Sequence, residues 1–426
     1  MSDHINPVKP EARMGSFAPI ETITFEAAKE ILRQHRLPKE VEECRLEDAL
    51  GRVLSFPIES KCDLPQFDNS AVDGFAICEE DRRLLERGTL TLEVVGTLEA
   101  GHRGALLRLR PGTTVYVLTG APVPPHTAAV AMQEDTAWMD GRVALSSPLT
   151  PQKNVRFRGE ECLLGSWLFE AGTCVTPAMV GALAAAGCET VEVFCAPKIG
   201  VLTTGSEIIR SGTERAPFQT YDANGPSLVA ALHTFGIADV RHLHAIDDTA
   251  SISEALHDLL ADRDLILCVG GVSVGERDVV RPTLAAAGVK TLIQGVAIRP
   301  GKPFFLGQKG LQIVFGLPGN PLSALISYLV FVLPYLRQAM GSPGCATCCS
   351  RRAKLSGDLK SKRGLRHFIP GTLIDGGFEP ATNRCSSMLT GLGTANALAI
   401  VPEELGEAKA GDEIDVLPIR WQACNL

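Results

Sequence analysis

The chain has 426 residues, a formal net charge of −8 at pH 7, and 21% charged residues. This length exceeds one usual hydrophobic core, so we expect several domains. The negative charge provides no basic field for nucleic acid or for an anionic membrane, so neither is expected as a partner. Residues 1–20 lack the residue order of a signal peptide, and the expected location is the cytoplasm.

Thirteen cysteines are present, and without an export signal we expect them to be reduced thiols rather than a disulfide framework. Cys345, Cys348 and Cys349 form one cluster with a metal-like spacing. A closed zinc site needs four ligands, and no second pair of this spacing occurs, although Cys385 or His367 could fold nearby. The sequence therefore favours a linker that carries thiols.

The first half of the chain contains a helical start and a β-rich stretch. Apolar residues recur at helical spacing over 24–36, more loosely over 41–54, and again over 177–186. Between 88 and 145, short apolar or β-branched runs are separated by glycine and proline turns, which predicts an all-β insert.

Strands and helices are predicted to alternate from about 197 to 340. This order predicts a mostly parallel sheet with helices on both faces, a doubly wound α/β/α domain. Leu322 to Leu333 is strongly apolar, but it contains serines and meets Pro334, so we interpret it as a buried helix and expect no membrane span. The expected strands are 198–202, 239–246, 264–269 and 311–315, and the expected helices are 227–233, 251–260, 279–287 and one from Pro321.

The tail beyond about residue 350 has strand-like runs at 368–374, 397–401 and 413–417, which predict a C-terminal β domain. The fold class is therefore α/β and β multidomain. The predicted boundaries are 1–62 for an N-terminal helical, elongated domain that continues at 165–196, 63–164 for the β-rich insert, 197–345 for the α/β domain, and 346–426 for the C-terminal β domain.

Two glycine-rich turns in the α/β part are candidate anion sites. One runs from Gly316 through Pro318, Gly319 and Asn320 to Pro321, between an apolar run and a helix. Its glycines let the backbone approach a ligand, Asn320 could cap the helix, and Pro321 suits the first helical position. Such a turn binds phosphate or carboxylate through backbone N–H groups. The second turn, 270–278, follows another predicted strand.

Acidic residues follow three of the predicted strands. Each alone has an ordinary explanation, since Asp247 and Asp248 could form a solvated turn and Glu207 could begin a helix. Parallel strands end at one edge of the sheet, however, so Glu207, Asp247 and Asp278 are expected to converge with the glycine turns. A polar loop at 67–76, which includes Asp73, and the strand end at Thr119 lie near the β insert.

Together these segments resemble the molybdopterin molybdenumtransferase family, the MoeA and gephyrin E-domain type. They occur in the family's order and cover nearly the whole chain. The matching segments are Asp68 to Gly74, Thr119 to Pro124, Arg158 to Glu160, Thr204 to Glu207, Gly270 to Asp278, Pro300 to Pro303 and Gly316 to Pro321.

The resemblance implies a four-domain, elongated homodimer that inserts molybdenum from molybdate into adenylylated molybdopterin, with Mg²⁺ and release of AMP. It places each active site between the α/β domain of one subunit and the β insert of the other. The catalytic residues implied are Asp73, Thr119, Glu161, Glu207, Asp247 and Asp278, of which Glu207, Asp247 and Asp278 would hold the metal. The implied binding residues are Gly205, Ser206, Gly270, Gly271, Ser273, Gly275, Arg299, Pro300, Lys302, Gly316, Pro318, Gly319, Asn320 and Ser386.

The chain departs from the family at the molybdate site. Of two lysines and an arginine expected there, the first lysine position is Gly295, the second is Arg299, and the arginine falls at Pro370. Arg366 could replace the arginine, and Ser386 matches the family's serine. Glu161 stands where the family commonly has aspartate.

Two alternatives therefore remain open beside a molybdenum insertase. One is a divergent enzyme for another oxyanion such as tungstate, and the other is a molybdopterin-binding scaffold without catalysis. The set of three acids favours an enzyme, because a pure binder has little need of them.

Overall fold

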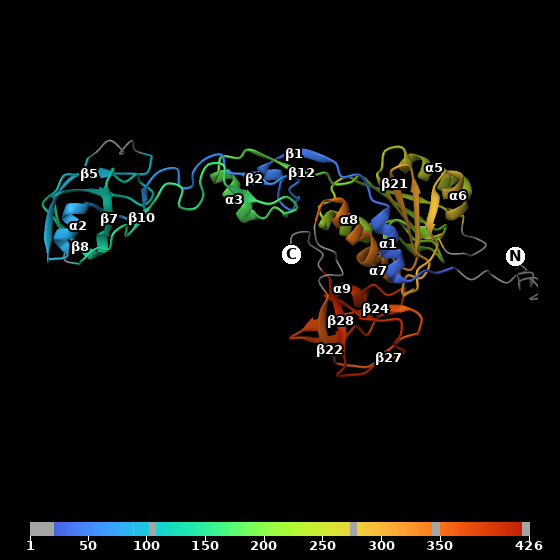
Figure 1. Cartoon of the computed structure of the whole chain (residues 1–426). Coiled ribbons are helices and arrows are strands. Elements are labelled where there is room, and N and C mark those ends of the chain that lie inside the picture. The colour runs from blue at the N-terminus through green and yellow to red at the C-terminus, as the bar shows by residue number, and fades with distance from the viewer. Residues whose placement is uncertain are drawn as a thin grey trace, which may run out of the picture. The chain divides into compact units, whose positions relative to one another are not determined.

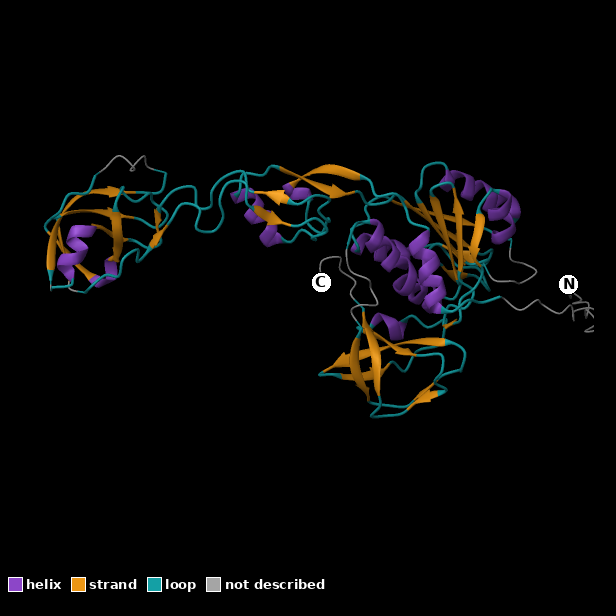
Figure 2. Ribbon diagram, in the orientation of Figure 1, coloured by secondary structure: helices purple, strands orange, loops and turns teal. Residues whose placement is uncertain are grey.

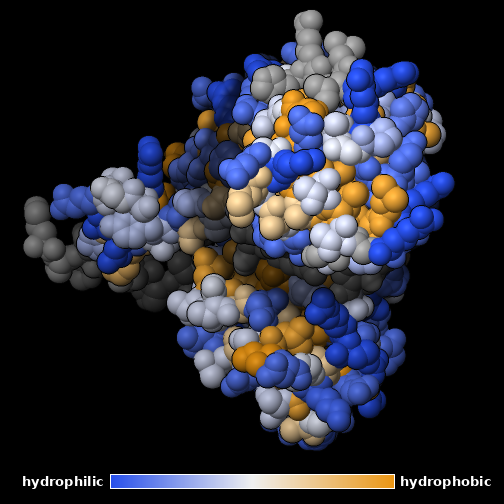
Figure 3. Space-filling view, turned by 90° about the vertical axis from the view of Figure 1, so that its left-hand side faces the viewer, coloured by the Kyte–Doolittle hydropathy of each residue, from blue (hydrophilic) through white to orange (hydrophobic). Residues whose placement is uncertain are grey.

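The computed structural model describes residues 21–87, 89–101, 108–145, 147–272, 279–342 and 350–419. The chain forms two compact units, whose elements are labelled in Figure 1 and coloured by type in Figure 2. One unit consists of Glu43–Leu50 and Phe56–Glu192, and the other contains the rest of the chain. Hydrophobic patches interrupt a largely hydrophilic surface on the face seen in Figure 3.

The unit that ends at Glu192 contains a six-stranded sheet with the order β7-β4-β6-β5-β9-β8. Alternate residues of β4 face two apolar clusters: Phe75 and Ile77 pack into one, and Ala76 into the other. The predicted all-β stretch is thus present, with one helix, α2, that the sequence analysis missed. The elements are β4 (Gly74–Cys78), α2 (Glu79–Leu85), β5 (Leu90–Leu98), β6 (Thr113–Val117), β7 (Thr127–Met132), β8 (Thr136–Met139) and β9 (Arg142–Leu145).

Short paired strands make up the rest of this unit, together with α3 (Pro177–Ala185). Thr176 caps α3 by accepting from the Met179 backbone, and Pro177 occupies the first turn, where its missing N–H is not needed. Strand β3 pairs with β10, and β2 with β11. The bounds are β2 (Ile58–Glu59), β3 (Asn69–Ser70), β10 (Val155–Arg156) and β11 (Trp167–Phe169).

The prediction of a loose helix over 41–54 is wrong. Strand β1 (Val41–Arg45) pairs with β12 (Thr190–Phe194), and a three-residue 3-10 turn follows at Leu46–Asp48. The pairing partner of β1 lies about 150 residues further along the chain, which local periodicity cannot reveal.

The second unit is built around a six-stranded sheet with the order β16-β13-β17-β21-β20-β18. Strands β16, β13, β17 and β21 are parallel to one another, and β20 runs antiparallel beside β21 and β18. The predicted strands are therefore confirmed. Their bounds are β13 (Ile199–Thr204), β16 (Val240–Ala245), β17 (Leu265–Val269), β18 (Lys290–Ile293), β20 (Phe305–Lys309) and β21 (Gln312–Leu317).

Helices cover both faces of this sheet, as Figure 1 shows. Central strand β17 is buried throughout: Leu265 and Leu267 face one apolar cluster, and Ile266 and Cys268 face the other. Helices α5 (Thr249–Leu260) and α6 (Val280–Ala286) contribute to the second cluster. The first cluster takes in α1 (Phe25–Gln34), α4 (Asn224–Thr234), α7 (Pro321–Ser327) and α8 (Leu333–Ala339).

Helices α7 and α8 continue one another through a π-helical segment, Tyr328–Val332. Within the described residues, Pro321–Ala339 is the one helical run whose length and composition would suit a membrane span, and 83% of it is buried inside the protein. It is the core helix that the sequence predicts.

The C-terminal strands close into a small barrel, because β24 pairs with both β25 and β26 while β28 and β22 complete the ring. Phe25 of α1 joins the barrel to the α/β core, with its ring 5.3 Å from the rings of both Phe331 and Phe368. The strands are β22 (Arg351–Leu355), β24 (Arg366–Ile374), β25 (Gly377–Pro380), β26 (Ala397–Val401) and β28 (Glu413–Pro418). A small pair, β23 (Leu359–Lys360) and β27 (Glu407–Ala408), and the short helix α9 (Thr390–Gly393) accompany it.

Candidate functional site

The carboxyl ends of β13, β16, β17 and β21 lie side by side at one edge of the α/β sheet. Each is followed by a segment that the sequence singles out. These are Gly205 to Glu207 after β13, Asp247 after β16, Gly270 and Gly271 after β17, and Pro318 to Asn320 after β21. Ligands of open α/β sheets bind at such an edge.

Two of the candidate acids lie together on this edge. The Asp247 backbone donates to Ser206 Oγ at 3.1 Å, and the Ser206 backbone donates to Asp247 Oδ2 at 3.3 Å, so the two loops are joined. The Glu207 carboxylate folds back over Gly205, where a Cβ atom would lie 3.2 Å from both its oxygens. Neither acid has an ion-pair partner among the described residues, so both charges are available to a cation.

The glycine turns after β17 and β21 touch each other. The Gly270 backbone donates to Leu317 O at 3.2 Å, and a Cβ atom on Gly319 would lie 3.4 Å from Gly270 Cα. Gly270 has a φ of +92°, a conformation that strains any residue with a side chain. Asn224, at the start of α4, donates from Nδ2 to Gly319 O at 2.7 Å and so fixes the second turn.

A polar network behind this turn was not identified from the sequence. Asp222 accepts from Thr203 Oγ1 at 2.9 Å and from the Gly225 backbone at 2.9 Å, and its Oδ2 lies 3.4 Å from His242 Nε2. Burial raises the pKa of Asp222, but the hydrogen bonds from His242, Gly225 and Thr203 outweigh it and hold the pKa below its usual value. The sequence signal was the pair Asp222 and Asn224 just before an apolar helical run.

The C-terminal barrel contributes Ser386 to the same edge. Asn320 donates from Nδ2 to Ser386 Oγ at 3.2 Å, and the Leu322 backbone donates to Ser386 O at 3.0 Å. The expectation that the Asn320 side chain caps the helix is wrong: it makes no capping hydrogen bond, because it turns to Ser386. Pro321 does occupy the first helical turn.

Only some of the positions predicted to surround the oxyanion carry a positive charge. Arg299 in β19 (Ile298–Arg299) and Lys302 are both exposed and have no ion-pair partner among the described residues. Gly295 and Pro370 are buried, and their carbonyl groups accept from Ile23 at 3.1 Å and from Ala381 at 2.9 Å.

The suggestion that Arg366 replaces a missing cation is not supported by its contacts. Its guanidinium donates to Glu403 at 2.8 Å and to Glu26 at 2.7 Å, and only 18% of its side chain is exposed. Two carboxylates therefore already balance its charge. Neighbouring His367 is buried and accepts from the Lys362 backbone at 3.0 Å, and burial together with the charge of Arg299 lowers its pKa.

In the other unit, two candidate residues form one pair. Asp73 Oδ1 accepts from the Thr119 backbone at 2.6 Å and from its hydroxyl at 2.8 Å. These bonds hold the pKa of Asp73 below its usual value, so the group is a carboxylate at neutral pH. Glu161 is exposed, and its backbone donates to Leu64 O at 2.9 Å.

Three predicted site residues, Ser273, Gly275 and Asp278, lie outside the described residues, as do Cys345, Cys348 and Cys349. Within the described part of the chain, no three His, Cys, Asp or Glu side chains form a metal-binding group. The cysteines that the structure describes are all free thiols.

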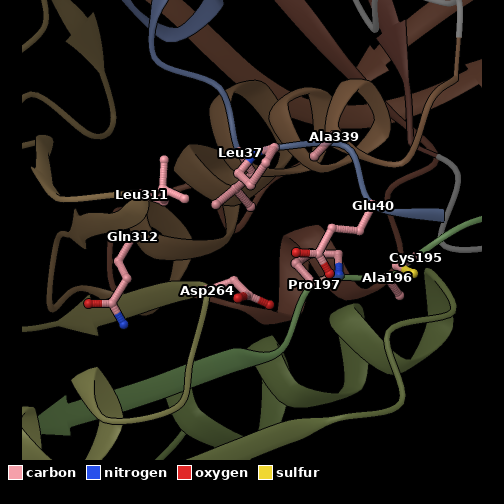
Figure 4. Close-up of a pocket in the computed structure, with 10 residues that line it drawn as sticks. Leu37, Glu40, Cys195, Ala196, Pro197, Asp264, Leu311, Gln312 and Ala339 are labelled. Carbon is pink, nitrogen blue, oxygen red and sulfur yellow. The ribbon is translucent and has the colours of Figure 1, made fainter.

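A cavity of about 120 Å³ lies at the opposite, amino edge of the same sheet (Figure 4). Two of its polar side chains are hydrogen bonded within the protein: Asp264 Oδ2 accepts from the Lys198 backbone at 2.7 Å, and Gln312 donates to Leu260 O and Arg263 O at 2.9 and 2.7 Å. Burial raises the pKa of Cys195 on its wall.

An α/β/α domain with glycine turns at its carboxyl edge, together with a β-rich unit and a C-terminal β barrel, is the domain set of MoeA proteins. Three family models match the chain in this order: the MoeA N-terminal region (domain I and II) at residues 23–187, a probable molybdopterin binding domain at 200–338, and the MoeA C-terminal region (domain IV) at 352–419.

Similar proteins cover nearly the whole chain. Molybdopterin molybdenumtransferase 2 of Mycobacterium tuberculosis is 36% identical over 384 residues, which is 87% of this chain and 93% of that protein. Molybdopterin molybdenumtransferase of Nostoc sp. is 30% identical and covers 97% of this chain and 95% of its own. The crystal structure of the molybdopterin biosynthesis MoeA protein from Pyrococcus horikoshii has a TM-score of 0.79 at 27% identity, covering 94% of this chain and 100% of that one. The chain belongs to the molybdopterin molybdenumtransferase family, whose enzymes act in molybdenum cofactor biosynthesis.

Proposed function

We propose that the chain inserts molybdenum from molybdate into adenylylated molybdopterin and releases AMP, in a reaction that requires Mg²⁺ and takes place in the cytoplasm. The observation that carries this proposal is the convergence of two touching glycine turns with Ser206 and Asp247 at one edge of the sheet. A pyrophosphate needs both backbone N–H donors and a way to balance its negative charge, and this edge offers both.

The two turns would hold the pyrophosphate through backbone N–H groups, around Gly270 and Gly271 on one side and Gly319 on the other. Asn224 fixes Gly319 in place, so the donors need little rearrangement when the ligand binds. Gly205 and Gly316 are required by packing, because a Cβ atom would lie 2.5 Å from Ile208 Cγ1 at the first and 2.8 Å from Phe305 Cβ at the second.

Asp247 and Glu207 fit a magnesium site, because both are exposed carboxylates without an ion-pair partner in the described part of the chain. Mg²⁺ prefers a few carboxylates completed by phosphate oxygens and water. Asp278 is the third proposed ligand. The bound metal would balance the charge that develops as the phosphate bond is cleaved.

Arg299, Lys302 and Ser386 are the proposed partners of the oxyanion, with Pro300 shaping the turn between the two cations. An arginine grips two oxygens at once, which partly offsets the missing charges at Gly295 and Pro370. We expect Arg299→Ala to raise the molybdate concentration at half saturation about tenfold or more, since a charge-assisted contact contributes roughly 1.5 to 3 kcal/mol. Unchanged saturation would place the oxyanion elsewhere.

We also propose a homodimer whose active sites use Asp73, Thr119 and Glu161 of one subunit and the α/β edge of the other. Large apolar side chains are exposed in the unit that carries Asp73: Phe56, Leu163, Leu164 and Trp167 are 56%, 59%, 66% and 60% exposed. Such surfaces mark interaction sites. Mixing Asp73→Asn with Asp247→Asn protein should restore part of the activity through mixed dimers, whereas no recovery after proven subunit exchange would place each site within one chain.

The direct test is to incubate the purified protein with adenylylated molybdopterin, Mg²⁺, and either molybdate or tungstate, and to measure AMP and metal-loaded cofactor. The proposal expects both products with molybdate and none when Mg²⁺ is chelated. Products with tungstate but not with molybdate would identify the divergent enzyme. The altered positions Gly295 and Pro370 are relevant to this choice between oxyanions. Binding without AMP release would identify a scaffold.

A further inference from the structure

Two buried polar atoms at the carboxyl edge lack a hydrogen-bond partner among the described residues. They are Thr204 Oγ1, on a residue that is 8% exposed, and Asn224 Oδ1. Buried polar groups in native proteins are nearly always hydrogen bonded, so each such atom requires an explanation. One explanation is a partner that arrives with the ligand.

Both atoms border the touching glycine turns. A Cβ atom on Gly270 would lie 2.9 Å from Thr204 Oγ1, and one on Gly271 would lie 3.3 Å from it. Gly270 places no side chain of its own over the hydroxyl, and over Gly271 the Val280 Cγ2 atom would lie 2.5 Å from an added Cβ atom. Asn224 bonds Gly319, and Gly319 in turn contacts Gly270, so a chain of direct contacts links the surroundings of the two atoms.

The bonds already made determine what each atom can do. The carbonyl of Gly319 can only accept, so it must face the amide nitrogen of Asn224, and Oδ1 remains as a pure acceptor. The Thr204 hydroxyl can donate or accept. Asn224 Oδ1 therefore needs an N–H or O–H group, and Thr204 Oγ1 suits a phosphate oxygen.

We infer that Thr204 and Asn224 bind the substrate directly. Thr204 Oγ1 donates to a phosphate oxygen held at the Gly270 and Gly271 turn. Asn224 Oδ1 accepts from a donor on the ligand, either a ribose hydroxyl of the nucleotide or an N–H group of the pterin. The inference rests on the proposed function, because it assumes that a pyrophosphate-bearing substrate occupies this edge.

Thr204→Val tests the first contact, because valine keeps the shape and removes only the hydroxyl. Inorganic pyrophosphate with Mg²⁺ is the probe, titrated calorimetrically into the full-length protein, with Thr204→Ser as the rescue. Ser55→Ala is the matched control, since Ser55 Oγ is also buried without a partner among the described residues but lies outside the site.

We expect Thr204→Val to weaken pyrophosphate binding about tenfold or more while the midpoint of thermal unfolding stays unchanged or rises, since an unpartnered buried group is removed. Thr204→Ser and Ser55→Ala should bind as the wild type does. Equal affinity in wild type and Thr204→Val would overturn the Thr204 contact, as would a loss of thermal stability large enough to explain weaker binding. Absence of pyrophosphate binding by the wild type would instead overturn the proposed function, and this inference with it.

Asn224→Ala tests the second contact with four probes: pyrophosphate, AMP, AMP without ribose hydroxyls, and a free pterin. Loosening of Gly319 should weaken the phosphate-bearing probes by one common factor. Loss of the Oδ1 contact adds roughly a fivefold weakening only for the probe that carries the donor. An extra loss for AMP but not for its deoxygenated form assigns the ribose, and an extra loss for the pterin assigns the N–H group. A common factor for all phosphate probes with unchanged pterin binding would overturn the Asn224 contact.

Discussion

The two edges of the α/β sheet are built from the same strands but differ in how their charged side chains are paired. At the amino edge, the buried guanidinium of Arg263 is paired with the carboxylates of Asp239 and Asp262. At the carboxyl edge, Asp247 and Glu207 are exposed and have no ion-pair partner in the part of the chain that the structure describes. Polar groups satisfied within the protein serve the fold, whereas those left unsatisfied are available to a ligand.

The largest difference between the two edges is expected from a pair of glycine substitutions. Gly270 and Gly288 both have positive φ, +92° and +84°, so alanine at either costs roughly 1 kcal/mol of backbone strain. An added methyl group at Gly270 meets Thr204 O and Oγ1 at 2.9 Å, whereas at Gly288 the nearest atom is Lys309 Cε at 3.9 Å.

Gly270→Ala should therefore weaken pyrophosphate binding by more than about 100-fold, equivalent to roughly 2.7 kcal/mol, while Gly288→Ala leaves it unchanged. Calorimetric titration on folded protein measures the affinities. Urea unfolding measures the stability that each variant loses, which should be larger for Gly270→Ala because its methyl group meets the Thr204 backbone. Equal binding by both variants would show that the turn after β17 does not contact the ligand.

Arg263→Ala tests the structural character of the amino edge. Its side chain is 9% exposed and donates to Asp262 at 2.9 and 2.6 Å, while its aliphatic part lies beside Gly200. We expect the free energy of unfolding to fall by about 1 to 3 kcal/mol, because the variant loses the buried guanidinium that pairs with the more exposed carboxylates of Asp239 and Asp262. AMP release per folded molecule should stay the same. A selective loss of activity in stably folded protein would contradict this assignment.

The Asp222 network predicts a smaller effect that depends on pH. The pKa of Asp222 is lowered in the folded protein, so the carboxylate stabilises the fold at neutral pH, and that contribution disappears as the pH falls through the lowered pKa. Asp222→Asn should cost roughly 1 to 2 kcal/mol at pH 7 and progressively less below about pH 4, the ordinary aspartate range. Denaturant titrations of both proteins between pH 3 and 7 give the difference in their free energies of unfolding. A difference that stays constant over this range would exclude the Asp222 carboxylate as its cause.

The sequence predicts this sheet well because its signal is local. Apolar runs that end in glycine or acidic residues identify β13, β16, β17 and β21, and the parallel order brings Asp247 and the glycine turns to one edge. What could not be predicted depends on distant partners. Asn320 turns to Ser386, Arg366 is held by Glu26 and Glu403, and β1 pairs with β12.

The central claim is that chemistry occurs at the carboxyl edge of the sheet and not at the amino edge. Asp247→Asn and Asp264→Asn are matched changes of exposed aspartates at the two edges. An asparagine at position 264 can still accept the hydrogen bond from the Lys198 backbone. The measurement is Mg²⁺-dependent AMP release from adenylylated molybdopterin by each folded variant. The account predicts that Asp247→Asn loses at least about 99% of the activity, as expected for a metal-bridged carboxylate, and that Asp264→Asn retains nearly all of it. Retained activity in Asp247→Asn, or an equal loss in both variants, would contradict it.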